Sequence, residues 1–314
     1  MSNLKMDLER SDADWRATEA SVRQRLKKPG AESLSLCALF ADASDSEWFW
    51  VLTQGRRKLP LLQERLPKLP DSETQANFTG LSGDAGFVQA VCAAAIFREE
   101  VRRMGGVLGS ESCLLDFGCG WGRITQVFLR DFEPENIVAI DVAPDAIELF
   151  LGSGMDCRLQ QVDPLPPMDL DDESVDLITA YSVFSHLAES VHLAWLEEFR
   201  RVLRPGGVLT VTTRPREFID HVVSLRSQDE IPDFARGAAQ AFVDADASYA
   251  RYDAGEFCFD PAGAGGGMRT EFYGEALIPR RYVERNWGKL FSQVGFISHL
   301  DHQSFDQNVL VARK

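Results

Sequence analysis

The chain has 314 residues, of which 45% are hydrophobic, and it carries 48 acidic against 33 basic side chains, a formal net charge of -15. This length is sufficient for one large α/β domain with additions or for two modest domains. Because so negative a surface repels phosphate groups, the charge argues against a protein that binds nucleic acids or anionic membranes.

The cysteines and the apolar runs indicate in which cellular compartment the protein is expected. The six cysteines are scattered, with no Cys-x-x-Cys pair and no histidine at metal-ligand spacing, so we expect reduced thiols and no metal site. The N-terminal stretch "MSNLKMDLERSDADWR" is polar, unlike a signal peptide, and the longest apolar run, "VCAAAIF", is much shorter than the ~20 residues of a membrane span. We therefore expect a cytoplasmic protein that binds no membrane.

The first third of the chain favours helices. Residues 1–75 are helix-leaning and hold no chemical motif, whereas "FTGLSGDAG" at 78–86 predicts a turn-rich loop. Apolar spacing over 87–104 predicts a further helix. We therefore predict an N-terminal helical cap over 1–104, followed by a second domain over 105–314.

Strands and helices alternate in the middle of the chain. Apolar runs predict strands over 113–116, 137–141, 158–162, within 174–184 and over 208–213, and helices over 123–132, 144–152 and 190–203. The last helix is expected to end at a turn, "RPGG", and "GFISHLDH" and "NVLVARK" predict a terminal antiparallel hairpin. Because the strands are apolar on both faces, we predict an α/β fold with a doubly wound, mostly parallel, seven-stranded sheet.

Residues 214–280 interrupt this alternation. They combine aromatic side chains with Asp, Ala and Gly, and "GAGGG" at 263–267 predicts a surface loop. We predict that they form an insertion after the fifth strand that builds a substrate site.

The stretch "LLDFGCGWGRI" at 114–124 holds three glycines at alternate positions, Gly118, Gly120 and Gly122, directly after a strand. The dinucleotide fingerprint, G-x-G-x-x-G, is one residue longer. Asp116 stands at the end of the strand, where its carboxylate would repel a pyrophosphate by ~2–4 kcal/mol at an effective dielectric constant near ~20. The same charge attracts an ammonium group, so the loop favours a ligand with a positive group.

Asp141 ends the second strand, about 20 residues beyond the glycines, where an acidic residue accepts hydrogen bonds from a ribose diol. A ligand with a ribose at one end and an ammonium group at the other is S-adenosylmethionine. The pattern therefore indicates a methyl donor as cofactor.

Four motifs together resemble the class I S-adenosylmethionine-dependent methyltransferases. They are "LLDFGCGWGRI", "VAIDVAP", "DDESVDLITAYSVFSHL" and "FRRVLRPGGVLTVTT", which cover about residues 100–214. The resemblance implies a Rossmann-like fold. The flanking segments resemble bacterial members that act on sugars, glycans or other small hydroxylated metabolites. The fourth strand gives "AYSV" where many amino-methylating enzymes have an "NPPY"-type tetrapeptide, which favours an oxygen acceptor.

The resemblance also implies cofactor-binding residues, namely Asp116, Gly118, Gly120, Gly122, Asp141, Val142, Asp163 and Tyr181. It places Asp116 near the methionine ammonium group and Tyr181 near the methionine portion. It places Asp163 near the adenine amino group, although a plain loop aspartate before a proline is an equal interpretation.

Candidates for the acceptor side come from the residues themselves. His186 follows the fourth strand at the carboxyl edge of the sheet, where it would open the next helix as a candidate general base or as a structural hydrogen-bonding residue. Arg214 and Arg216 end the fifth strand, where they either recognise an anionic substrate or form salt bridges. Tyr252 and Tyr273 in the insertion line the acceptor pocket or belong to a core.

We therefore expect an enzyme that transfers a methyl group from S-adenosylmethionine to a small molecule, at a hydroxyl oxygen of a sugar, glycan or other metabolite. One alternative is a non-catalytic protein that binds the donor and acts as a partner or scaffold. A nucleotide-cofactor oxidoreductase or epimerase is a second alternative, although it would need the third glycine one residue later and no Asp116.

Overall fold

The computed structural model describes residues 4–9, 11–231, 235–262 and 269–314, so the predicted loop at 263–267 lies outside the described residues. The chain divides into two compact units, Met1–Glu99 with Val107–Gln160, and Glu100–Gly106 with Gln161–Lys314. This division does not follow the domain boundary expected at 104/105, which stays a prediction.

The first unit begins with short helices. They are α1 (Leu4–Leu8), α2 (Arg16–Leu26), α3 (Leu36–Phe40), α4 (Asp45–Trp50), α5 (Arg56–Lys58), α6 (Pro60–Arg65), α7 (Ser72–Thr79) and α8 (Gly83–Arg103). Side chains of Ser35, Ser44 and Asp71 accept backbone N–H groups at the starts of α3, α4 and α7. The loop predicted over 78–86 is shorter than expected, because α7 continues until Gly80 ends it in a left-handed conformation and α8 begins three residues later.

One stretch of this unit is long and apolar enough to cross a membrane. It runs over Ser72–Arg103, and 56% of its most apolar window is buried within the protein. Two buried aromatic side chains, Phe87 and Phe97, belong to it. Such burial is typical of the core helix of a soluble protein.

The remainder of the first unit alternates strands and helices, as predicted. It contains β1 (Leu114–Phe117), α9 (Arg123–Phe128), β2 (Ile137–Asp141), α10 (Pro144–Ser153) and β3 (Arg158–Gln161). β1 and β2 are parallel, with Leu114 opposite Ile137. The predicted helix end at Gly152 was wrong by two residues, since Gly154 adopts the left-handed conformation that ends α10.

The N-terminal helices are bonded to α9, the helix that follows the glycines. The Trp48 indole N–H donates to the Val127 carbonyl at 2.7 Å, and the Arg56 guanidinium donates to the Gln126 side chain at 2.9 Å. These bonds are buried or partly buried. The helical cap therefore fixes the start of the α/β alternation within one unit.

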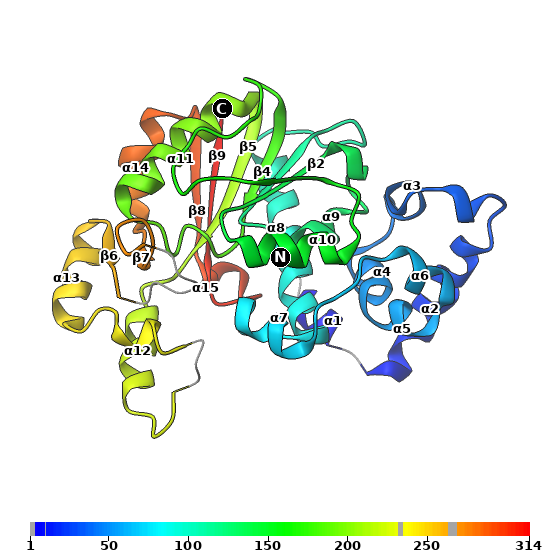
Figure 1. Ribbon diagram of the computed structural model, residues 1–314, viewed down its shortest axis with the longest axis horizontal. Coiled ribbons are helices and arrows are strands. Elements are labelled where there is room, and N and C mark those ends of the chain that lie inside the picture. The colour runs from blue at the N-terminus through cyan, green and yellow to red at the C-terminus, as the bar shows by residue number, and fades with distance from the viewer. Residues whose placement is uncertain (1–3, 10, 232–234, 263–268) are drawn as a thin grey trace. The chain divides into compact units, whose positions relative to one another are not determined.

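The second unit contains β4 (Val175–Ala180), α11 (Glu189–Val202), β5 (Leu203–Thr213), α12 (Phe218–Arg226), α13 (Ala245–Ala254), β6 (Cys258–Asp260), β7 (Glu275–Leu277), α14 (Arg280–Asn286), β8 (Gln293–Ile297), α15 (His299–His302) and β9 (Asn308–Arg313). β4 is parallel to β5, and β9 is antiparallel to both β5 and β8, as Figure 1 shows. The predicted terminal hairpin is confirmed, with α15 in its connection.

The "RPGG" segment is not a separate turn between a helix and a strand. Leu203 already pairs with Val175, and the next paired residues are Leu177 and Val208. The segment is therefore an irregularity within one long strand, β5, because pairing with β4 resumes on its far side.

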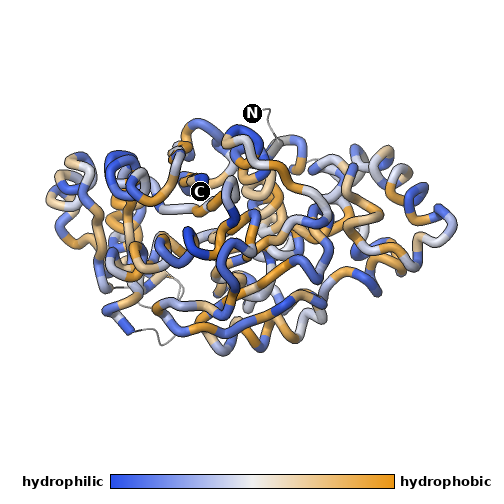
Figure 2. Tube along the Cα trace, turned by 90° about the horizontal axis from the view of Figure 1, so that it is seen from above, coloured by the Kyte–Doolittle hydropathy of each residue, from blue (hydrophilic) through white to orange (hydrophobic). Residues whose placement is uncertain are grey.

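The seven strands form one sheet in the order β3-β2-β1-β4-β5-β9-β8, which confirms the predicted fold class. Figure 2 shows hydrophilic and hydrophobic residues interspersed along the whole chain. This pattern is typical of elements that each bury one side.

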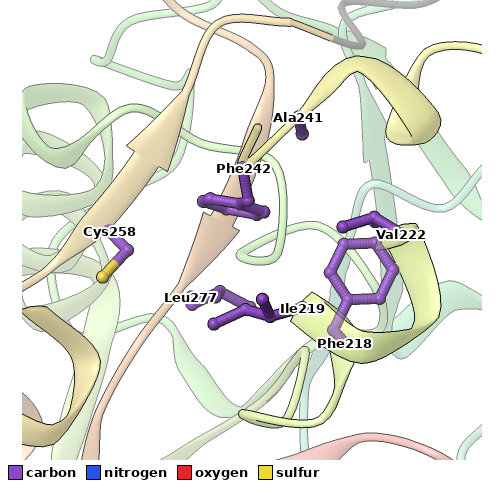
Figure 3. Packing of buried hydrophobic residues seen from close by; sticks show 7 residues of the cluster. All are labelled: Phe218, Ile219, Val222, Ala241, Phe242, Cys258 and Leu277. Carbon is purple, nitrogen blue, oxygen red and sulfur yellow. The ribbon is translucent and has the colours of Figure 1, made fainter. Parts of the chain in front are cut away.

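The insertion after β5 has a small core of its own. Its buried side chains come from α12, the segment before α13, β6 and β7, and Figure 3 shows them facing one another: Phe218, Ile219, Val222, Ala241, Phe242, Cys258 and Leu277. β6 pairs with β7 in antiparallel register, with Asp260 opposite Glu275. This core fixes the position of β7.

Candidate functional site

The glycine loop, residues 118–122, is anchored to the end of β2. The N–H groups of Gly118 and Cys119 both donate to the Ile140 carbonyl, at 2.8 Å and 3.0 Å. All three glycines of the loop have positive φ, at 74°, 54° and 87° along the chain. Residues with side chains rarely adopt this conformation, so the path of the loop depends on glycine.

Two of the glycines, Gly122 and Gly120, differ in the space around their Cα atoms. A Cβ added at Gly122 would lie 2.1 Å from the Met155 Cε atom and 3.1 Å from the Phe150 ring, so this glycine allows close packing with α10 and its following residues. At Gly120 only the Phe78 ring lies within 4 Å, at 3.7 Å. The Gly120 side of the loop is therefore open enough for a ligand to approach the backbone.

The carboxylate of Asp141 lies against this loop. One oxygen accepts the N–H of Gly120 at 2.9 Å, and the other accepts the N–H of Ala143 at 2.9 Å. Burial raises the pKa of Asp141, while the N–H groups of Ala143, Gly120 and Val142 oppose that shift. Because a carboxylate oxygen can accept two hydrogen bonds, both oxygens retain capacity for ribose hydroxyls.

Asp116 supplies a second carboxylate at the end of β1. Its side chain is 1% exposed, and the Thr125 hydroxyl donates to it at 2.5 Å. Burial, together with the charges of Asp116 and Asp141, raises the pKa of Cys119 well above its usual range, so that thiol stays neutral. Arg123, the basic residue of this stretch, donates to the Gly86 carbonyl and the Gln89 side chain.

The open glycine backbone and the two carboxylates fit S-adenosylmethionine. The Asp141 carboxylate can accept further hydrogen bonds from hydroxyl groups such as those of a ribose, and a buried carboxylate such as that of Asp116 attracts an ammonium group. Val142, half-buried after Asp141, continues the same strand end. The sequence analysis did not single out Phe78, which is 42% exposed and lies beside Gly120. The sequence feature that could have indicated it is an aromatic side chain within the loop predicted over 78–86.

Two predicted cofactor residues lie in the second unit. Asp163 is exposed in the loop after β3. Tyr181 follows β4 and is 8% exposed, with its ring edge-on to Phe305 at 5.7 Å. The next residue, Ser182, has φ of 60°, a conformation that is uncommon outside glycine and recurs at functional sites.

His186 lies in the turn before α11, which begins at Glu189, so the expectation that it opens the helix was wrong by three residues. Its Nδ1 atom is 2.9 Å from the Gly274 carbonyl, and its ring stacks on Tyr273 at 4.9 Å with an interplanar angle of 9°. Since a carbonyl oxygen only accepts, Nδ1 is assigned the proton and Nε2 has the lone pair. Burial, and then the charge of Arg214, lowers the pKa of His186 to about 4, so the ring is neutral at neutral pH.

The insertion brings Tyr273 to His186 through backbone pairing. The N–H of Gly274 donates to the His186 carbonyl at 2.8 Å, and the N–H of Ala276 donates to the Ser185 carbonyl at 2.7 Å. The pairing explains why residues distant in sequence share one site. We call residues 185–187, 213–214 and 273–275 the acceptor region.

The two arginines after β5 have different surroundings. The Arg214 guanidinium lies over the Phe218 ring at 4.6 Å and 3.9 Å from the Asp306 carboxylate, and its Nε atom has no hydrogen-bond partner among the described residues. Arg216 instead makes two hydrogen bonds of 2.7 Å with the Asp253 carboxylate. Tyr252 packs against the core of the insertion, and burial raises its pKa to about 12.

Glu275 is an acceptor-region residue that sequence reasoning missed. Its side chain is 5% exposed, Oε1 lies 3.6 Å from the His186 Nδ1 atom, and Oε2 has no hydrogen-bond partner within the described part of the chain. Burial raises the pKa of Glu275 to about 7, with Asp260 adding to the effect and Arg214 and His221 opposing it. Its signal in the sequence was one acidic residue within "FYGEALI".

Across residues 4–9, 11–231, 235–262 and 269–314, no group of three or more His, Cys, Asp or Glu side chains is arranged to hold a metal ion. The first unit contains the glycine loop with its two neighbouring carboxylates. The second unit contains His186 with Tyr273 and Glu275 beside it.

Residues 115–209 match a family described as "Methyltransferase domain", and this range includes the glycine loop, Asp141 and His186. The chain is 28% identical over 140 residues to a malonyl-[acyl-carrier protein] O-methyltransferase from Paenibacillus sp. strain JDR-2, covering 42% of this chain and 50% of that protein. It is 30% identical over 110 residues to the protein of the same description from Hahella chejuensis, covering 34% of this chain and 39% of that protein.

The chain thus spans half or less of the length of these curated relatives. It is also 31% identical over 105 residues to a tRNA(Thr) (cytosine(32)-N(3))-methyltransferase from Saccharomyces cerevisiae, covering 30% of this chain and 17% of that protein. A solved structure of a SAM-dependent methyltransferase from Methanosarcina mazei has 17% identity and a TM-score of 0.43, covering 66% of this chain and 94% of that chain.

Proposed function

We propose, for a chain that belongs to the class I S-adenosylmethionine-dependent methyltransferases, that it methylates a hydroxyl oxygen of a small molecule, such as a sugar, a glycan or another metabolite. S-adenosylmethionine is the cofactor and supplies an electrophilic methyl group on a sulfonium. The observation that carries the choice of an oxygen acceptor is the neutral imidazole of His186. Its Nδ1–H is held by the Gly274 carbonyl, which leaves the Nε2 lone pair for a hydroxyl proton.

The chain's own residues have separable tasks under this proposal. Asp141 and Asp116 hold the cofactor by its ribose and ammonium groups, and the Gly120 backbone receives it at close range. His186 orients the hydroxyl and receives its proton, while Tyr273 holds the imidazole plane by stacking. Arg214 recognises a polar or anionic group of the acceptor through its unpaired Nε–H.

Further observations support an oxygen acceptor and disfavour a nucleic acid. Two of the relatives are described as O-methyltransferases, and the "AYSV" after the fourth strand lacks the amide and proline pattern expected of many amino-methylating enzymes. The net charge of -15 disfavours a nucleic-acid acceptor despite the tRNA-modifying relative. We place the protein in the cytoplasm, binding no membrane.

The test is turnover with matched histidine variants. The wild type, incubated with S-adenosylmethionine and a panel of hydroxylated acceptors (hexoses, phenols and hydroxy acids), should release S-adenosylhomocysteine and an O-methylated product detectable by mass spectrometry. His186→Asn should lower kcat by ~100-fold or more, because the general base is lost. His299→Asn, a change at a partly exposed histidine near Glu217, should leave kcat unchanged.

Two outcomes would contradict the proposal. Methylation of nitrogen or carbon in the product would reject the oxygen acceptor. Binding of S-adenosylmethionine without release of S-adenosylhomocysteine from any acceptor would favour a non-catalytic, donor-binding partner protein.

A further inference from the structure

The acceptor region contains a buried carboxyl group that no salt bridge explains. Glu275 is 5% exposed, and its Oε1 atom lies 3.6 Å from the Nδ1 atom of the neutral His186 ring, beyond normal hydrogen-bond length. Its Oε2 atom is buried without a hydrogen-bond donor among the described residues. Burying a carboxyl group in this way opposes folding, and such groups cluster at functional sites.

The protein holds this costly group firmly at one place. β7 is paired to β6 on one side, and Leu277, two residues after Glu275, is fully buried in the core shown in Figure 3. The Gly274 and Ala276 N–H groups, on either side of Glu275, both bond to the segment that carries His186. The backbone therefore fixes the carboxyl group beside the imidazole.

The two side chains differ in access. The His186 side chain is 14% exposed, and the Glu275 side chain is 5% exposed. A ligand can therefore reach the imidazole more readily than the carboxyl group. The Nδ1–H on the inner side of the ring points at the Gly274 carbonyl and lies near the Glu275 Oε1 atom.

We propose that Glu275 is the positioning residue that makes His186 an effective base, as the inner member of a Glu–His pair. This proposal rests on the proposed hydroxyl methylation. The acceptor O–H bond breaks as its oxygen forms a bond to the methyl carbon, and the methyl–sulfur bond breaks with its electron pair remaining on sulfur. The hydroxyl proton passes to His186 Nε2, the Nδ1 proton stays in its hydrogen bond to the Gly274 carbonyl, and the ionised Glu275 carboxylate beside Nδ1 stabilises the imidazolium that forms.

The charges around the pair support this role of the carboxylate. Without a negative neighbour the imidazole is a poor site for a proton, since burial and Arg214 lower the pKa of His186 to about 4. Burial and Asp260 raise the pKa of Glu275 to about 7, against the effects of Arg214 and His221, so the stabilising charge is present at and above neutral pH.

Kinetics of Glu275→Gln, which keeps the shape of the side chain and removes its charge, test the pair. At pH 8 this variant should lose about 10- to 100-fold in kcat, with the acceptor KM and the S-adenosylmethionine Kd nearly unchanged. In the wild type kcat should fall as the pH drops through about 7, since a protonated Glu275 cannot stabilise the imidazolium, and the variant should lack this step. Glu275→Asp should recover part of the rate, and Glu284→Gln, a change at an exposed acid of α14, should behave as wild type.

A second measurement does not need turnover. Nitrogen chemical shifts of the His186 ring, identified by comparison with His186→Asn, should report a titration near pH 7 in the wild type that disappears in Glu275→Gln. Identical ring titrations in the two proteins, or equal kcat and pH profiles, would overturn the pair. If no hydroxyl acceptor is methylated by the wild type, the proposed function fails, and the ring titration alone decides whether Glu275 and His186 are coupled.

Discussion

The carboxylates beside the glycine loop and the polar atoms of the acceptor region are satisfied in opposite ways. Beside the loop, both oxygens of Asp141 accept backbone N–H groups, and Asp116 accepts the Thr125 hydroxyl, whereas the Trp121 indole nitrogen within the loop is buried without a hydrogen-bond partner among the described residues. In the acceptor region, Ser185 Oγ, Thr213 Oγ1 and Glu275 Oε2 are buried without hydrogen-bond partners among the described residues.

This difference indicates how the glycine loop and the acceptor region are each organised for binding. The loop is a backbone cradle whose shape is held by the hydrogen bonds of Gly118 and Cys119 to Ile140 and of Gly120 to Asp141. The acceptor region carries desolvated polar atoms, and leaving such atoms unpaired costs about 1–3 kcal/mol each. We interpret that cost as the mark of a site whose hydrogen bonds are completed by a substrate.

The comparison can be tested first through stability at different pH. Because the pKa of Glu275 lies above its ordinary value of 4.5, at about 7, its contribution to stability is full below about 4.5 and is lost as the pH rises through about 7. Glu275→Gln removes this dependence. The free energy of unfolding of the variant relative to the wild type, from urea titrations, should therefore rise by ~2 kcal/mol between about pH 5.5 and about pH 8. A difference independent of pH would mean that Glu275 is not a strained, buried acid.

A second test separates the two glycines of the loop. Gly122→Ala places a Cβ against Met155 and Phe150 at a φ of 87°, so it should lower the free energy of unfolding by ~2–3 kcal/mol. Gly120→Ala meets only Phe78 and should cost the fold less, ~1 kcal/mol, but should weaken S-adenosylmethionine binding. Thermal unfolding and calorimetric binding of both variants give the comparison. Equal loss of stability in the two variants would contradict the open Gly120 side.

Asp141→Ala tests whether the carboxylate beside the glycine loop binds the ribose of S-adenosylmethionine. The Kd for S-adenosylmethionine should rise by about 10- to 100-fold, corresponding to ~1.5–3 kcal/mol, because ribose hydroxyls lose a charged acceptor. Isothermal titration calorimetry measures the effect, and circular dichroism checks that the variant is folded. A folded variant with unchanged affinity would remove Asp141 from the cofactor site.

The smallest expected effects distinguish the two arginines. Arg216→Ala breaks an exposed pair with Asp253 and should change stability by less than ~1 kcal/mol, with no effect on the acceptor KM. Arg214→Ala should raise the acceptor KM, because its unpaired Nε–H belongs to the acceptor region. Steady-state kinetics of both variants, at saturating S-adenosylmethionine, make the measurement. A larger change in KM for Arg216→Ala than for Arg214→Ala would reverse the assignment.

The sequence by itself determined the fold class and the composition of the cofactor loop. β2 begins and ends where its apolar run does, and Pro144 stands at the first turn of α10 as predicted. Asp116, the glycines and Asp141 all lie within about one β-α-β unit, where strand ends and turn conformations follow from local residue types. Element ends were less predictable, since "RPGG" is held within β5 by pairing with β4.

The tertiary structure alone decided the acceptor region. Neither Gly274 nor Glu275 has a local pattern that links it to His186, because their contact arises when the insertion pairs with the segment after β4. The sequence also could not predict which of the two arginines forms a salt bridge. Arg216 pairs with Asp253 only because α13 packs on α12. Backbone conformation and strand-end position are short-range properties, whereas the partner of a buried polar group depends on which distant segments the fold brings together.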